Sequence, residues 1–275
     1  MLALFSITLP NKIQAQIIEN KESRAFSEYE DQKAKIDEEI KQLKAQEWAG
    51  EYNMFDEFLT VAPKSGFAFF LRKGIGDYGY STGDVQMSDG KLNLISKKPN
   101  KWEPLSIFSS EIIPVLWGER HYLIPSSEMM RFINTINEGY EPGSKLTFFG
   151  NRFFLRTGDE DKQVSRMPNI PEQWRDYLLK KPIRARILEI GESIESVDEY
   201  GEQQKVTTVI LNVGSNSGVK EGMEFMTISP SGVHEDVIIT KVEKVKSQGK
   251  VIKSGLYATS PDLNWKLSTS GRDIK

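Results

Sequence analysis

Residues 48–95 decide the fold, and they read WAGEYNMFDEFLTVAPKSGFAFFLRKGIGDYGYSTGDVQMSDGKLNLI. Apolar and aromatic residues alternate with polar ones in short runs, which is the pattern of half-buried strands. Turn residues separate these runs, as in the segments 63–66 and 88–90. Frequent turns of this kind are typical of antiparallel sandwiches and barrels. The expected strands cover 48–52, 58–62, 67–71, 84–87 and 91–95. We therefore expect a mainly β chain.

The same stretch opens with Trp48-Ala-Gly50-Glu-Tyr52 and continues as strands joined by Gly and Asp-Gly turns. This arrangement resembles the lipocalin-like class of small barrels over residues 48–97. The resemblance implies a lipocalin-like antiparallel β-barrel or sandwich. A hairpin over 112–124 continues the pattern, and its Pro114 predicts an edge position because proline has no N–H to donate.

A helix should follow the hairpin, because Ser126 can act as an N-cap and Gly139 as a C-terminal stop. Its apolar face contains Met129, Phe132, Ile133 and Ile136. With a closing strand over 148–156, this flanking helix would complete an aromatic-rich β domain of residues 48–157.

Residues 158–181 are expected to be a linker, with a short helix over 172–179 that follows Pro171. A second, small β-barrel domain is expected over 182–275, with strands at 183–189, 205–213, 224–229, 236–245 and 249–253. Its segment Val209-Ile-Leu-Asn-Val-Gly-Ser-Asn-Ser-Gly-Val-Lys-Glu-Gly-Met-Glu-Phe225 is similar to the small envelope β-barrel of the rod-shape protein MreC and of flagellar assembly protein T. The resemblance implies an SH3-like β-barrel in which Gly214, Gly218 and Gly222 are structural turn residues.

Gly222 should precede the strand 223–229 with a positive φ or a close neighbouring strand. Gly232 should lie in an exposed hairpin that can relax.

The N-terminus has two expected segments. Residues 1–16 match the end of a secretory signal, with the apolar stretch MLALFSITL, a polar break and Ala15 as a small residue before Gln16. A basic n-region is missing, which is consistent with a signal peptide shortened at its start, and a buried N-terminal element is the alternative. The apolar stretch is too short to span a bilayer, so no transmembrane segment is expected.

An amphipathic helix is expected over 17–47. Its seam repeats at spacings of three and four residues, which is the coiled-coil pattern, through Phe26, Tyr29, Lys33, Ile36, Ile40, Leu43 and Glu47. Docking on its own protein is one interpretation of this seam, and self-association through residues 26–47 is the other.

Composition excludes several classes of function. The net charge is −3 and basic residues are mixed with acidic ones, so we expect no nucleic-acid partner. There is no cysteine, which excludes disulfides and thiol chemistry, and two histidines are too few for a multi-histidine metal site. We expect no cofactor, no metal and no catalytic residues.

Three local features that could belong to a functional site are expected to have ordinary structural roles. The glycines of Gly74-Ile-Gly76-Asp-Tyr-Gly79 fit a hairpin loop, because strand residues and not a helix follow them. His121 and His234 are expected to be ordinary strand and surface residues. The acidic run 159–161 is expected to be part of a solvated linker.

The aromatic residues of the first domain are candidates for a ligand or partner surface. Phe69 and Phe70 are adjacent, so they must point to opposite faces of their strand. Either both faces are covered, or an apolar patch is exposed for a partner. The candidates are Trp48, Tyr52, Phe69, Phe70, Tyr80, Trp102 and Trp117, and core packing is the alternative for all of them.

The sequence therefore predicts an exported, periplasmic or extracellular protein of the cell envelope. Its expected role is non-catalytic binding or scaffolding of envelope proteins. A lipocalin-like carrier of a small apolar ligand is the alternative, and an envelope hydrolase without a local signature is the third hypothesis. A carrier needs an empty apolar interior, a scaffold needs exposed patches, and an enzyme needs converging polar groups.

Overall fold

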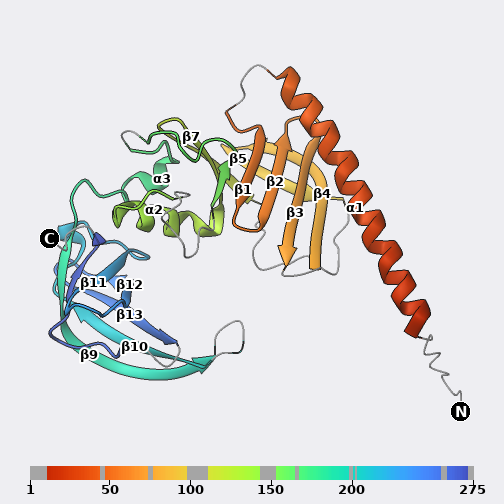
Figure 1. Ribbon diagram of the computed structural model, residues 1–275. Coiled ribbons are helices and arrows are strands. Elements are labelled where there is room, and N and C mark those ends of the chain that lie inside the picture. Colours follow the sequence, from red (N-terminus) through yellow and green to blue (C-terminus); the bar gives the residue numbers. More distant parts are fainter. Residues whose placement is uncertain are drawn as a thin grey trace, which may run out of the picture. The chain divides into compact units, whose positions relative to one another are not determined.

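The computed structural model describes residues 11–43, 47–73, 77–97, 111–142, 153–164, 167–197, 201, 203–254 and 259–271 (Figure 1). The chain forms two compact units, one of residues 1–126 and 148–169 and the other of residues 127–147 and 170–275. These units differ from the expected division at 48–157, 158–181 and 182–275. Residues 158–169 belong with the first barrel, and the helix expected to flank that barrel belongs with the second.

The first unit is a closed antiparallel barrel in which each strand pairs with the next along the chain. Its strands are β1 (Gly50–Met54), β2 (Glu57–Ala62), β3 (Gly66–Lys73), β4 (Asp77–Ser88), β5 (Lys91–Ser96), β6 (Glu111–Trp117), β7 (Arg120–Pro125) and β8 (Phe154–Arg156). The barrel closes where β1 pairs with β8, with Tyr52 opposite Arg156. The mainly β fold with an antiparallel barrel is therefore confirmed.

Two features noted in the sequence, Pro114 and the glycines of residues 74–79, fall in or beside strands of the first barrel. The edge position predicted from Pro114 is wrong, because β6 pairs with β5 on one side and with β7 on the other. Pro114 itself lies beyond the two residue pairs that join β6 to β5, so its missing N–H falls outside that ladder. Strand β4 begins at Asp77 and includes Gly79, so a strand and not a helix follows the start of this glycine motif, whose residues 74–76 lie outside the described ranges.

Packed side chains fill the interior of the first barrel. The strands alternate, so every second residue points inward. The buried cluster contains Tyr52, Met54, Leu59, Val61, Phe67, Phe69, Leu71, Leu92, Leu94, Ile112, Leu123 and Phe154. Burial of this apolar surface is the main favourable contribution to the stability of the barrel.

Helix α1 (Asn11–Gln42) lies along the outer face of β2, β3 and β4 (Figure 1). Tyr29 and Ile36 of the predicted seam are buried against this face, in one cluster with Phe70 and Tyr80. The docking interpretation therefore describes how the seam is used in this structure. The helix ends before Glu47 and begins inside the expected signal segment, whose residues 1–10 lie outside the described ranges. Export thus stays a prediction.

The second unit contains a second closed barrel, with strand order β10-β13-β12-β11-β14-β9. Its strands are β9 (Arg184–Val197), β10 (Gln203–Leu211), β11 (Glu224–Ser229), β12 (Asp236–Val242), β13 (Ser247–Ser254) and β14 (Lys266–Ser268). Its core contains Trp265, Phe225, Leu211 and Leu267, all at most 1% exposed. A small barrel was predicted, whereas the three-residue strand β14 and the continuation of β9 past Glu189 were not.

Four short helical segments accompany the strands outside α1 in the part of the chain that the structure describes. The turn Ser126–Glu128 is a 3-10 helix (η1), α2 covers Met129–Asn137 and α3 covers Glu172–Arg175, and a further 3-10 turn, η2, covers Ser215–Ser217. Glu128 and not Ser126 precedes α2, and no side chain caps it, so the predicted serine N-cap is wrong. Gly139 ends α2 with a φ of +91°, as predicted.

The turn glycines of the second barrel are required for two different reasons. Gly218 and Gly222 have φ values of +85° and +84°, which a residue with a Cβ rarely adopts. Gly214 is extended, but a Cβ there would lie 2.2 Å from the carbonyl oxygen of Glu243. The close neighbour of Gly222 is Met130 of α2 and not a strand. Gly232 also has a positive φ, of +88°, so a side chain there would be strained as well.

Candidate functional site

The predicted aromatic surface does not form one surface among the described residues. Tyr52 and Phe69 belong to the interior of the first barrel, and half-buried Trp48 packs against that interior. Phe70 and Tyr80 lie under α1 with their rings 5.3 Å apart, so both faces of β3 are covered. Trp117 is buried at the end of β6. Trp102 lies outside the described ranges.

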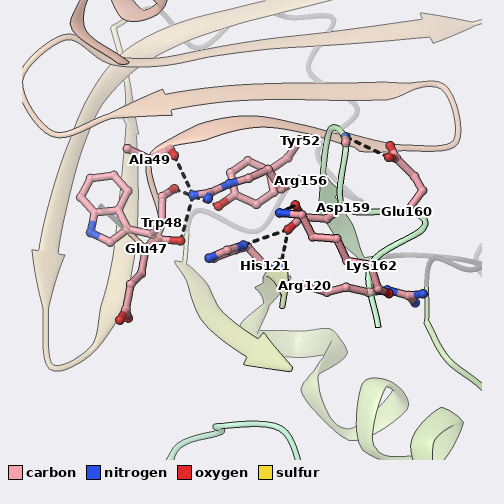
Figure 2. A network of polar contacts seen from close by, with 11 residues as sticks. Glu47, Trp48, Ala49, Tyr52, Arg120, His121, Arg156, Asp159, Glu160 and Lys162 are labelled. Carbon is pink, nitrogen blue, oxygen red and sulfur yellow. Dashed lines mark hydrogen bonds and ion pairs between the residues drawn. The ribbon is translucent and has the colours of Figure 1, made fainter. Parts of the chain in front are cut away.

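An arginine at the end of β8 joins the barrel to the chain that enters it. Arg156 Nη2 donates hydrogen bonds to the carbonyl oxygens of Glu47 and Ala49, at 2.9 and 2.7 Å (Figure 2). Its guanidinium carbon also lies 5.5 Å from the centre of the Tyr52 ring, within the range of a cation–π contact. Burial raises the pKa of Tyr52 to about 12, against the opposing effect of Arg156, so the phenol stays neutral. The neutral hydroxyl donates to the carbonyl oxygen of Trp48.

Beside this contact, the segment after β8 folds back over β7. Asp159 is 1% exposed and accepts hydrogen bonds from the His121 backbone N–H, from His121 Nδ1 and from Lys162 Nζ, at 2.8, 2.8 and 2.6 Å. Burial alone would raise the pKa of Asp159, but the hydrogen bonds from Lys162 and His121 lower it below its usual value. Arg120 donates to the carbonyl oxygen of Lys162 (Figure 2).

This network corrects two predictions. Asp159 is not part of a solvated linker, and His121 is held by a carboxylate rather than standing as a plain strand histidine. A histidine held through Nδ1 by an aspartate is also found in general bases. Here the same carboxylate also accepts hydrogen bonds from Lys162 and from a backbone N–H. These contacts hold the segment after β8 against β7. The turn Thr157-Gly158-Asp159 after the closing strand does not by itself indicate that Asp159 meets His121, 38 residues away.

The second barrel carries an exposed arm, made of β9 residues 188–197, which pairs with β10 (Figure 1). Ile187, just before the arm, is buried in the barrel core. Four apolar residues of β9 are exposed there, with relative exposures of 55% for Leu188, 38% for Ile190, 58% for Ile194 and 61% for Val197. These residues are divided between the two faces of the strand pair, since Ile194 lies opposite Val206 and Val197 lies opposite Gln203, so the arm exposes apolar side chains on both faces. Exposed apolar residues that gather on one element mark interaction surfaces more often than isolated ones do. Sequence reasoning missed the arm because Gly191 interrupts the alternation, although Ile194 and Val197 resume apolar positions.

A second feature of the second unit is a group of three carboxylates near α2. Burial, together with the nearby carboxylates Glu224 and Asp236, raises the pKa of Glu138 to about 8. Burial also raises the pKa of Glu224. Asn134 of the same helix donates to the carbonyl oxygen of Gly222, so α2 is attached to the barrel beside these groups. Their charge state should therefore affect this attachment.

The described part of the chain contains neither a helix suited to cross a membrane nor a group of side chains suited to hold a metal ion. None of its helices combines the length and the apolar character needed to cross a membrane. Within the same ranges, no three His, Asp or Glu side chains are arranged to hold a metal ion.

Comparisons of the chain with protein-family models, curated proteins and solved structures gave no match. The resemblances to lipocalin-like barrels and to the MreC and flagellar barrels therefore stay predictions.

Proposed function

We propose that this chain is a non-catalytic binding or scaffolding protein of the cell envelope that holds another protein on its second barrel. The observation that carries the proposal is the arm of β9, with exposed apolar side chains at Leu188, Ile190, Ile194 and Val197. Exposed apolar surface of this kind becomes favourable when a partner covers it. Export rests on the signal-like segment of residues 1–16 and is part of the proposal.

The packing of the first barrel supports a binding role over the carrier alternative. A carrier of an apolar ligand holds it in a cavity lined by apolar side chains. In this barrel the inward side chains contact one another as a single buried cluster. The aromatic residues Phe70 and Tyr80 on the outer face of the barrel are covered by α1. The first unit is thus suited to be a stable module that accompanies the binding arm.

The His121–Asp159 pair does not favour the hydrolase alternative. Asp159 also holds Lys162 and the backbone of β7, and Arg120 fixes the same loop. All these contacts fasten residues 157–162 to the barrel, which accounts for the burial of Asp159 without a catalytic role.

A photo-crosslinking experiment tests the proposal. The full chain would carry p-benzoylphenylalanine in place of Ile194, and a control would carry it in place of the exposed Glu221, which lies in a turn of the same barrel. After irradiation in an envelope extract, adducts would be identified by mass spectrometry. We expect a protein adduct from position 194 that position 221 does not give. Equal adducts at both positions, or none at 194, would contradict the proposal.

A further inference from the structure

The arm has a strand edge to which a partner could add. On one side, β9 pairs with β10 along most of its length, from Ile187 to Val197. On its other side, β14 pairs only with residues 184–186. No strand of the described ranges pairs with that edge of β9 from residue 187 onward. Backbone N–H and C=O groups along such an edge can accept an additional strand.

The part of this edge that can extend a sheet is Ser193–Val197. Register shifts interrupt the pairing of β9 with β10 on the barrel side, between Thr207 and Val209 and between Ile210 and Leu211. Bulges of this kind weaken an edge as a template for pairing. From residue 193 to residue 197 the register is regular, and β10 is paired regularly with β13 behind it. An added strand would therefore continue an ordered three-stranded sheet.

The side-chain rows across this sheet define the chemistry of the added strand. Directly opposed residues share a face. Ile252, Val206 and Ile194 form one apolar row, and Lys253, Lys205 and Glu195 form the neighbouring row on the other face. The next position in the first row suits an apolar residue, and the next position in the second suits a basic residue beside Glu195. These two positions are consecutive along the added strand, so its side chains would alternate between apolar and basic.

A second copy of this chain fits the same edge poorly. The unpaired stretch 187–197 contains Glu189, Glu192 and Glu195 and no lysine or arginine. A β9–β9 pair would therefore place each of these glutamates opposite an uncharged residue or another glutamate. Like charges directly opposite each other are destabilising. The charge of the edge favours a basic partner.

We propose that the partner of this protein binds as an extended segment of alternating apolar and basic residues, added to the edge of β9 at Ser193–Val197. The inference rests on the proposed binding function and names its partner class. Main-chain hydrogen bonds would provide much of the affinity, and the Ile194 and Glu195 rows would provide the selectivity.

The test uses labelled peptides and the full chain, with binding measured by fluorescence anisotropy. The probe is the peptide (Val-Lys)4, and the comparison peptides are (Val-Glu)4 and the block peptide Val4Lys4. We expect (Val-Lys)4 to bind at least tenfold more tightly than both. Ile194→Asp and Glu195→Lys should each weaken that binding at least tenfold, and Glu195→Lys should shift the preference toward (Val-Glu)4. Glu221→Lys makes the same charge change away from the edge and should leave binding within twofold.

Several outcomes would overturn the inference. Equal binding of the alternating and block peptides would show attraction by charge alone. Binding that Ile194→Asp and Glu195→Lys leave intact would place the peptide elsewhere. If no peptide binds but position 194 crosslinks to a protein in extracts, the partner class is wrong and the proposed function stands. If both experiments fail, the proposed function fails too.

Discussion

Replacement of Arg156 tests whether the contacts at the end of β8 hold the first barrel closed. Arg156→Met keeps a side chain of similar length but removes the hydrogen bonds to the carbonyl oxygens of Glu47 and Ala49 and the contact with Tyr52. Hydrogen bonds from a charged donor contribute about 1.5–3 kcal/mol each. A cation–π contact adds about 0.5–1 kcal/mol.

The bond to Glu47 is exposed to solvent and should contribute only about 0.5 kcal/mol, so with the half-buried bond to Ala49 and the contact with Tyr52 the total loss should be about 3 kcal/mol. Arg156→Lys keeps the charge near Tyr52 but cannot reach both carbonyl groups in the same way, so it should lose about half as much. Losses of this size leave most domains folded, since their stability is about 5–15 kcal/mol.

Urea unfolding of the full chain, followed by hydrogen exchange of peptides from β1 to β3, measures the first unit separately from the second. With a slope of about 2 kcal/mol per molar urea, the midpoint for these peptides should fall by about 1.5 M in Arg156→Met. Arg72→Met is the matched control, because Arg72 is an exposed residue of the same barrel and should change stability by less than about 0.5 kcal/mol. If Arg156→Met and Arg72→Met unfold at the same urea concentration, the closing role of Arg156 is refuted.

Three further predictions concern pH and the turn glycines. The lowered pKa of Asp159 stabilises the first barrel above about pH 4 and is lost as the pH falls through the folded-state value, so Asp159→Asn should flatten the acid side of its stability curve. The pKa of Glu138 is raised to about 8, so this side chain contributes most to the stability of the second unit below about pH 4.5, and the contribution is lost as the pH rises through 8. Glu138→Gln should therefore flatten the decline in the melting temperature of the second unit between about pH 5 and 9, and an unchanged slope would contradict this. Gly222→Val and Gly232→Val should both be strained by about 1–3 kcal/mol, and only Gly222→Val should lose more through its contact with Met130, so equal losses in thermal melts of the full chain would refute that packing.

The barrels could be predicted from the sequence because their signals are local. Alternation around Phe67–Leu71 and the Asp-Gly turn before Lys91 specify strands and hairpins within a few residues. The same alternation predicted that Phe69 and Phe70 point to opposite faces, and the structure covers one with the barrel interior and the other with α1.

The polar network could not be predicted because its members are far apart in the chain. Asp159 meets His121 across 38 residues, and Arg156 meets Ala49 across 107. No spacing rule relates such residues before the barrel closes. For the same reason α2 was expected beside the first barrel, whereas Asn134 bonds to Gly222, which is 88 residues away.

The arm was missed for a different reason. The strand pattern of β9 is interrupted at Gly191 and by register shifts, so alternation seemed to end near Glu189. That an edge is unpaired is a property of the whole sheet and not of the strand alone.

The central claim is that the edge of β9 adds a partner strand, and amide hydrogen exchange of the full chain with and without (Val-Lys)4 tests it most directly. Added hydrogen bonds should slow exchange in the segment Ser193–Val197, where β9 already has a regular register with β10. Exchange in the first barrel and in the core strand β11 should not change. The account predicts new protection confined to the edge of β9 and absent from Ile194→Asp. Protection elsewhere in the chain, or the same protection in Ile194→Asp, would contradict it.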